Sequence, residues 1–174
     1  FAGSRPSALV GCAWASLVSI GKEGYQARTQ QILLASSKIT NGIQYGIPEL
    51  CILGNQRPSM VVCIGSSSSS CTSSDDNDDQ GVDIYRVADA MKERGWDLNS
   101  LQHPASIHVC VTLALAPQAE IFLTDLKEAV AQVEKEDPSH SQKGTAGMYG
   151  LAGSVPEGPV NDFLRTFLDL SVRA

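Results

Sequence analysis

Hydrophobic and polar positions along this chain predict a series of helices and a small sheet. Residues 6–20 form an apolar run that begins at a proline, so they predict a helix with Ser4 as its capping residue. Gly21 is expected to end it. Residues 23–41 carry a rough helical stripe and stop at Asn41-Gly42, which predicts a second helix.

Two apolar runs, residues 49–55 and 59–65, flank a turn and predict an antiparallel pair of strands. Residues 106–115 are rich in β-branched side chains and predict a third strand. Between them, residues 83–96 predict an amphipathic helix that Gly95 stops. Its expected inward positions are Ile84, Tyr85, Val87, Ala88 and Met91.

Residues 117–136 predict a long helix, and residues 160–172 predict a last one after a glycine-rich segment. The inward stripe of the long helix is expected at Ile121, Leu123, Leu126, Val130 and Val133. The order of these elements favours an α+β fold, in which helices cover one face of a three-stranded, mostly antiparallel sheet.

Residues 66–81 are rich in serine and aspartate, which cannot bury apolar surface, so they predict a disordered surface insertion. A calcium site is the alternative, because four aspartates cluster there. The spacing, central glycine and terminal glutamate of an EF-hand are missing, which disfavours it.

The chain has 174 residues, is 43% hydrophobic and carries a net charge of -6. One domain with one core is therefore expected. Its basic residues are scattered, which argues against binding to a nucleic acid. The most apolar stretch, residues 8–20, is too short to span a bilayer.

Five cysteines show neither metal-ligand spacing nor a disulfide framework. Four of them, Cys12, Cys51, Cys63 and Cys110, sit in apolar runs and are expected to be small buried side chains in a reducing compartment. Cys71 lies in the polar insertion.

Motifs of catalysis are scarce in the chain. The histidines, His103, His108 and His140, do not form a ligand pair and are interpreted as solvated or core-edge side chains. Asp83, Asp89, Glu93 and Asp97 are expected on a solvated helix face. The sequence contains no nucleophile elbow and no P-loop.

The start of the chain is the one candidate site. Ser4 and Arg5 precede a helix, where unpaired N–H groups and the helix dipole favour an anion. Arg5 adds a forked donor suited to phosphate. A serine cap near an arginine is also common without a ligand. Tyr149, in the glycine-rich segment, is either a functional phenol or a packing residue.

Three segments resemble the sphingosine-1-phosphate lyases, a pyridoxal-phosphate family of the group II decarboxylase type. The first is AGSRPSALVGCAWASLVSIGKEGY, which is similar at Gly3, Ser4, Arg5, Pro6, Trp14, Ala15, Gly21, Gly24 and Tyr25. The second, most specific one is DIYRVADAMKERGWDLNSLQHPASIHVCVTL, and the third is GMYGLA. The resemblance covers nearly the whole chain except the acidic insertion. Ser7 departs from the family, which has glycine there.

The resemblance implies the C-terminal portion of a fold-type I enzyme that works as a homodimer with its active site at the interface. Residues 1–21 would be the end of the large cofactor domain and a linking helix, and residues 22–174 the small C-terminal domain. Gly3 and Ser4 would bind the pyridoxal 5'-phosphate cofactor, and Arg5 and Tyr149 the substrate phosphate. No metal is implied.

The implied reaction is cleavage of the C2–C3 bond of a phosphorylated sphingoid base to a long-chain aldehyde and phosphoethanolamine. None of the lysines follows a histidine in the family's cofactor-lysine pattern, so this chain alone is expected to be inactive. The resemblance places the full enzyme in the endoplasmic reticulum membrane, anchored by an N-terminal part, with the catalytic part in the cytosol.

Two alternatives remain open from the sequence. One is a related amino-acid decarboxylase, and the other is a stand-alone, non-catalytic α+β binding module. A module would fold as a monomer, whereas a fragment would expose the apolar face of residues 8–20 and aggregate.

Overall fold

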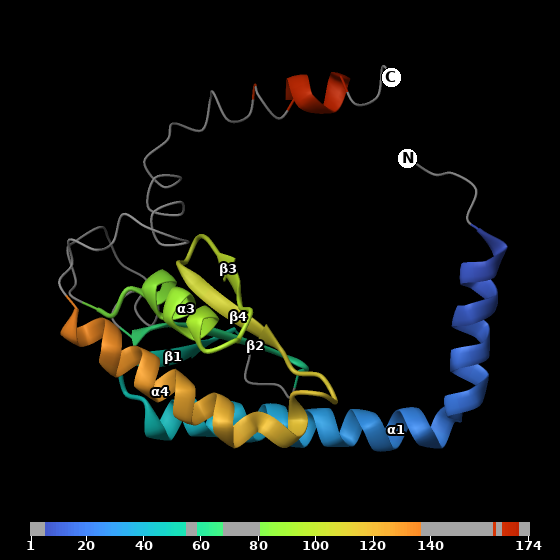
Figure 1. Ribbon diagram of the computed structural model, residues 1–174, viewed down its shortest axis with the longest axis horizontal. Helices are drawn as coiled ribbons and strands as arrows, with labels where there is room; N and C mark the ends of the chain where they lie inside the picture. The colour runs from blue at the N-terminus through green and yellow to red at the C-terminus, as the bar shows by residue number, and fades with distance from the viewer. Residues whose placement is uncertain (1–5, 55–58, 68–80, 137–161, 163–164, 171–174) are drawn as a thin grey trace.

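The computed structural model describes residues 6–54, 59–67, 81–136, 162 and 165–170 (Figure 1). Its elements in chain order are α1 (Ser7–Gly46), β1 (Leu50–Leu53), β2 (Val61–Ser66), α3 (Ile84–Glu93), β3 (Asn99–Leu101), β4 (Ser106–Cys110), the 3-10 helix η1 (Ala116–Gln118) and α4 (Ala119–Lys135). Residues 165–170 are also helical, inside the last helix predicted from the sequence. The predicted insertion and the glycine-rich segment lie almost entirely outside the described residues.

The two predicted N-terminal helices form one kinked helix, α1. Gly21 interrupts it with a φ of 66° and a ψ of 174°, a conformation that side chains with a Cβ rarely adopt. Residues 7–20, the N-terminal arm, therefore leave the axis of residues 22–46. Figure 1 shows that the arm rises on the same side of α1 as the sheet.

Both ends of α1 differ from the prediction. Pro6 rather than Ser4 is the N-cap residue, because its extended ψ of 123° places the helix boundary there. The helix also continues through Asn41-Gly42 to Gly46, since Ile43 is fully buried and holds the last turn against the core. Gly42 instead allows α1 and α4 to pack closely, because a Cβ at this position would overlap the side chain of Leu123 in α4.

The sheet has four antiparallel strands in the order β1-β2-β4-β3, rather than the three predicted. The predicted antiparallel pairing of β1 with β2 is confirmed, with Ile52 opposite Ile64. The additional strand, β3, pairs Ser100 with Ile107 of β4. It was missed because three residues, two of them polar, are too short to show an alternating pattern.

All three long helices among the described residues cover one face of the sheet, as predicted. The buried core joins residues of α1, α3 and α4 to strand positions such as Val62, Ile64 and Ile107. Burial of this apolar surface is the main stabilising term of the domain. Among the described residues no helix is both long and apolar enough to cross a membrane.

The predicted inward stripe of α4 is confirmed at Leu126, Val130 and Val133 and is wrong at Ile121. Phe122 is fully buried, whereas Ile121 is 56% exposed. Phe122 lies four residues before Leu126, at helical spacing, so it takes the place in the stripe that was predicted for Ile121. Leu123 is half-buried, against Gly42.

Polar contacts fix α3 against α4. The Trp96 Nε1–H donates to Asp125 Oδ2 at 2.7 Å, and the Trp96 ring meets that of Phe122 edge-on, with centroids 5.2 Å apart. Arg94 donates to Gln132 Oε1 at 2.9 Å. Arg86 and Glu136 form an ion pair at 2.9 Å. Together these contacts lock the two helices in register over the sheet.

Candidate functional site

The residues predicted to bind an anion immediately precede α1. Gly3, Ser4 and Arg5 fall outside the described residues, as does Tyr149. The structure describes the helix they lead into, which Pro6 opens without any side-chain cap hydrogen bond. The Leu9 N–H donates to the Pro6 carbonyl at 3.1 Å, which leaves the N–H groups of Ser7 and Ala8 without an acceptor within the helix. This end of α1 therefore has the donors that an anion needs.

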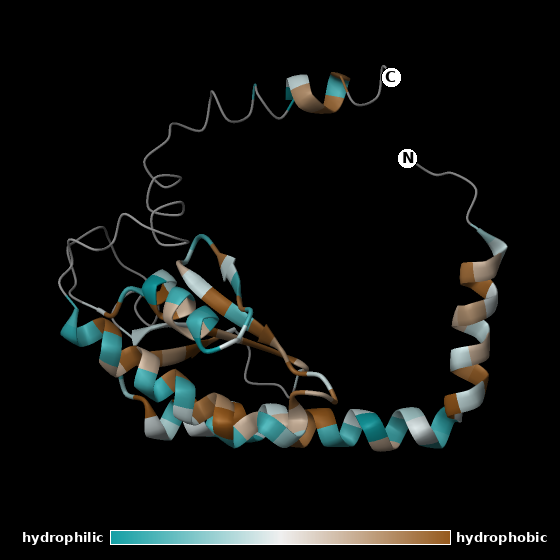
Figure 2. Cartoon of the chain, viewed as in Figure 1, coloured by the Kyte–Doolittle hydropathy of each residue, from teal (hydrophilic) through white to brown (hydrophobic). Residues whose placement is uncertain are grey.

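The N-terminal arm that carries this end is uncharged, mostly apolar and solvent-exposed. Leu9 is 65% exposed and Trp14 is 66% exposed, with Val10, Leu17 and Val18 similarly open. Residues 7–21 contain no charged side chain, and Figure 2 shows the arm as mostly brown and pale. A helix that is apolar all round is normally buried inside a larger structure. Its composition therefore suits an interior position rather than a solvated one.

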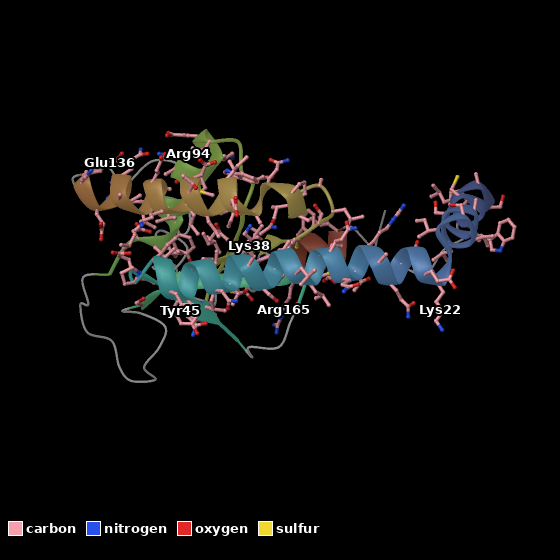
Figure 3. The ribbon with its side chains drawn as sticks, turned by 90° about the horizontal axis from the view of Figure 1, so that it is seen from below. Lys22, Lys38, Tyr45, Arg94, Glu136 and Arg165 are labelled. Carbon is pink, nitrogen blue, oxygen red and sulfur yellow. The ribbon has the colours of Figure 1, made fainter. Side chains whose placement is uncertain are left out.

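The lysines of the described residues do not form a cofactor site. Lys22, Lys38, Lys92, Lys127 and Lys135 are all exposed. Figure 3 shows Lys22 next to the kink of α1, pointing into solvent. Desolvation in an apolar pocket is one way in which a protein activates a lysine as a nucleophile, and none of these five exposed lysines is desolvated. Lys143 lies outside the described residues.

The ion pair between Lys38 and Glu120 joins α1 to α4 on the protein surface. The hydrogen bond from Lys38 and its positive charge lower the pKa of the Glu120 carboxyl below the ordinary value of 4.5. Both side chains are largely exposed, so the pair is interpreted as a surface contact between two helices rather than an acid–base site.

The described histidines occupy two different settings. His103 is exposed between β3 and β4 and has a φ of 57°. His108 is half-buried in β4, and its Nδ1 is buried without a hydrogen-bond partner. The interpretation of both as solvated or core-edge side chains fits their exposure, but it missed the unpaired nitrogen. Only the strand register could have shown it, since His108 lies opposite Cys63 in β2 and Asn99 in β3.

The expectation that the cysteines are buried is wrong for the described ones. Cys12 and Cys110 are exposed, and Cys51 and Cys63 are half-buried. Cys12 lies on the arm. The other three lie on the face of the sheet that points away from α1, α3 and α4, here called the open face. An apolar run in a strand places half of its residues on each face, so the run alone did not distinguish the two sides.

Two acidic side chains of the described part, Asp83 and Asp125, make structural hydrogen bonds. Asp83 is the N-cap of α3 and accepts hydrogen bonds from the backbone N–H groups of Tyr85 and Arg86. Asp125 accepts from Trp96. Among the described residues no group of three His, Cys, Asp or Glu side chains could hold a metal ion.

A groove of about 510 Å³ runs along α1 and is mainly apolar. Its described lining includes Tyr25, Gln30, Leu33 and Leu34. A second, of about 380 Å³, lies between α1 and α4 beside Gly42 and Leu123. Neither groove has a cysteine, a histidine or a pair of carboxylates among its described lining residues.

Comparison with known proteins places these features in context. No family model matches the chain. The sphingosine-1-phosphate lyase of Arabidopsis thaliana is 42% identical to it over 170 residues, which are 97% of this chain and 28% of that protein. The sphingosine-1-phosphate lyase of Saccharomyces cerevisiae is 36% identical over 170 residues, which are 97% of this chain and 26% of that protein.

The chain is also similar to a solved structure. The sphingosine-1-phosphate lyase of Burkholderia pseudomallei superposes with a TM-score of 0.60 at 36% sequence identity and covers 75% of this chain and 27% of that one. The chain thus spans less than a third of the length of the proteins it matches. That share agrees with the portion of a larger enzyme expected from the sequence.

Proposed function

Since this chain is homologous over 97% of its length to the sphingosine-1-phosphate lyases, we propose that it is the C-terminal portion of such an enzyme. The whole protein cleaves the C2–C3 bond of a phosphorylated sphingoid base. The similarity along the entire chain, at 42% identity, is the observation that carries this proposal. The exposed, uncharged arm supports it, because such a helix needs more protein around it.

In the proposed reaction, the two products together contain all the atoms of the substrate. The C3 hydroxyl loses its proton, the C2–C3 bond breaks, and C3 becomes the carbonyl carbon of a long-chain aldehyde. C2 takes up a proton, and this half leaves as phosphoethanolamine. Pyridoxal phosphate, when bound, supplies the electron sink for the pair left by the broken bond.

The chain's own contribution is phosphate binding near the start of α1. Gly3 and Ser4 would hold the cofactor phosphate, with the backbone N–H groups of the uncapped first turn as additional donors. Arg5 and Tyr149 would bind the substrate phosphate, for which the arginine offers paired donors. The uncapped helix end fits this role, because a side-chain cap would compete for the same N–H groups.

The domain division follows from the same proposal. Residues 1–21 end the large domain and form the link, and residues 22–174 form the small domain. The kink at Gly21 supports this boundary, since the arm and the packed part of α1 diverge there. The active site is completed at a homodimer interface, and the lyase acts at the endoplasmic reticulum membrane with its catalytic part in the cytosol.

This chain by itself is proposed to be inactive. The cofactor lysine belongs to the polypeptide outside it, and all five described lysines are exposed. Neither the wide groove along α1 nor the one beside α4 supplies a replacement.

The test is release of a long-chain aldehyde from a phosphorylated sphingoid base by the full-length protein that carries this chain. Arg5→Ala should raise the KM for this substrate by about tenfold or more, because a charged hydrogen bond to phosphate is lost. Arg28→Ala is the matched control, since Arg28 is exposed on α1 beyond the kink, and should leave KM unchanged.

The same assay separates the alternatives. Release of carbon dioxide from an amino acid, without aldehyde from the sphingoid base, would identify a decarboxylase instead. Turnover by residues 1–174 alone would refute the proposed inactivity of the fragment.

A further inference from the structure

The helix at residues 165–170, here called the terminal helix, belongs to an amphipathic segment with exposed apolar side chains. In the sequence, apolar residues share one helical face at positions 163, 164, 167 and 168. The charged residues fall on the opposite face, at Asp162, Arg165 and Asp169. Leu168 is 53% exposed and Leu170 is 65% exposed. Figure 1 shows the terminal helix, in red, apart from α1 and the sheet.

A helix as short as this one is not stable by itself in water. The first turn is costly to form, and isolated helices of fewer than about 12–15 residues are marginal. In proteins, such a helix gains most of its stability when its apolar face packs against another element. The terminal helix is therefore expected to pack on an uncharged surface.

The groove along α1 has the character and the length that this helix needs. None of its described lining residues is charged, and Tyr25 and Leu34 among them are 40% and 65% exposed. The lining extends from Tyr25 to Ser37, which is about 18 Å at 1.5 Å per residue. A helix of residues 162–170 is about 13 Å long by the same measure, so it fits within the groove.

The connection to α4 is long enough for the terminal helix to reach this groove. Lys38 of α1 contacts Glu120 at the start of α4. From this contact the end of α4 at Lys135 is about 22 Å away, and Gln30 in the groove is about 12 Å away. Residues 137–161 could span about 80 Å if fully extended, which exceeds the whole path.

We infer that the terminal helix docks into the groove along α1 of the same chain, with its apolar face against Tyr25, Leu33 and Leu34. The charged face then stays in water. A tethered helix meets its groove at an effective concentration of about millimolar, so even a weak contact of this size is sufficient within one chain. A helix from a second copy has no such advantage.

Docking has a consequence for the phosphate site, and this consequence rests on the proposed function. There Tyr149 binds the substrate phosphate, and it lies between α4 and the terminal helix in the sequence. Docking attaches this segment to the domain at both ends. A chain segment whose two ends are held has fewer conformations to lose on binding. Release of the terminal helix should therefore weaken binding of the substrate phosphate.

The experiment uses the folded full-length protein with a photoreactive amino acid in place of Gln30, which is exposed in the groove. After illumination and digestion with trypsin, mass spectrometry should find a crosslink to the peptide of residues 166–173, which follows Arg165 and ends at Arg173. The control carries the same amino acid in place of Glu128, which is exposed on α4, and should not give this crosslink. A mixture of isotope-labelled and unlabelled protein distinguishes crosslinks within one copy from crosslinks between copies.

Two variants of the terminal helix test its apolar face. Leu168→Glu should reduce the yield of the crosslink by about tenfold or more, because docking would bury an unpaired charge. Thr166→Glu adds the same charge outside the apolar positions and should preserve the crosslink. The inference is overturned by equal yields in the two variants, by a crosslink between copies, or by the absence of any crosslink from position 30 to residues 166–173.

Aldehyde release by the same two variants tests the consequence separately. Leu168→Glu should raise the KM for the phosphorylated sphingoid base, whereas Thr166→Glu should leave it unchanged. The crosslink does not depend on turnover. A crosslink within one copy, obtained with a protein that releases no aldehyde, would therefore support docking and contradict the proposed function.

Discussion

The orientation of α4 gives the sharpest test of the fold, because Ile121 was predicted to face inward and its neighbour Phe122 is buried instead. Phe122 is fully buried and Ile121 is 56% exposed. Phe122→Ala removes a buried aromatic side chain and leaves a cavity, which costs about 3–5 kcal/mol of unfolding free energy. Its edge-on contact with Trp96 adds to this loss.

Ile121→Ala is the matched variant in the same turn of the helix. An exposed substitution away from specific contacts changes stability by no more than about 0.5–1 kcal/mol, and alanine has the higher helix propensity. The two variants should therefore differ by at least about 2 kcal/mol.

Urea unfolding of this chain, followed by far-ultraviolet circular dichroism, measures the difference. The midpoint for Phe122→Ala should fall well below that of the parent chain, while the slope stays similar. The Ile121→Ala midpoint should remain close to the parent. Equal losses for both variants, or a larger loss for Ile121→Ala, would refute the phase of α4 and with it the packing of α4 on the sheet.

Two further predictions concern the contact between α1 and α4. Gly42→Ala places a methyl group against Leu123 and should destabilise the chain by about 1–3 kcal/mol in the same urea assay. Combining it with Leu123→Ala should recover part of that loss. A Gly42→Ala variant as stable as the parent would contradict the close approach of the helices. The pKa of Glu120, followed by NMR titration, should lie below 4.5 and return toward it in Lys38→Met. Because the pKa of Glu120 is lowered in the folded state, the stabilisation by the ion pair is present at neutral pH and is lost as the pH falls through the folded pKa. Added salt should weaken it. An unchanged Glu120 titration in Lys38→Met would exclude the ion pair as the cause of the lowered pKa.

Helix α3 shows what the sequence can predict on its own. Its apolar positions Ile84, Val87 and Met91 repeat at helical spacing and are all buried in the structure. Asp83 begins the helix and Gly95, with a φ of 89°, follows its end. Local pattern and tertiary packing agree here, so the prediction and the structure coincide within a few residues.

Predictions failed where the deciding contact lies far away in the sequence. Gly42 was taken as a helix end because glycine often ends helices, but Leu123 of α4 is what requires a small residue there. The faces of β2 cannot be assigned from a run in which both alternate sets are apolar, so Cys63 was expected in the core. The short strand β3 exists only through its pairing with β4.

The residue pattern predicted an anion site at Ser4 and Arg5, and only the family resemblance assigned it to a cofactor phosphate and a substrate phosphate. Comparison with known lyases confirms the relationship. The roles of Gly3, Ser4, Arg5 and Tyr149 stay predictions, because these residues lie outside the described part. Pattern alone was insufficient, since a phosphate site divided between distant segments leaves no continuous motif in any one of them.

The backbone geometry of Gly21 also determines where the first residue of α1 lies in space. A Cβ at this position would meet nothing within 4 Å, so only the torsion angle of 66° resists replacement by a larger residue. The arm of residues 7–20 is about 21 Å long at 1.5 Å per residue. Gly21→Ala should favour a continuous straight helix, which would move Ser7, at the start of α1, by a distance comparable to that length. A substitution that disturbs no side-chain contact at its own position could thereby uncouple substrate phosphate binding from the rest of the domain.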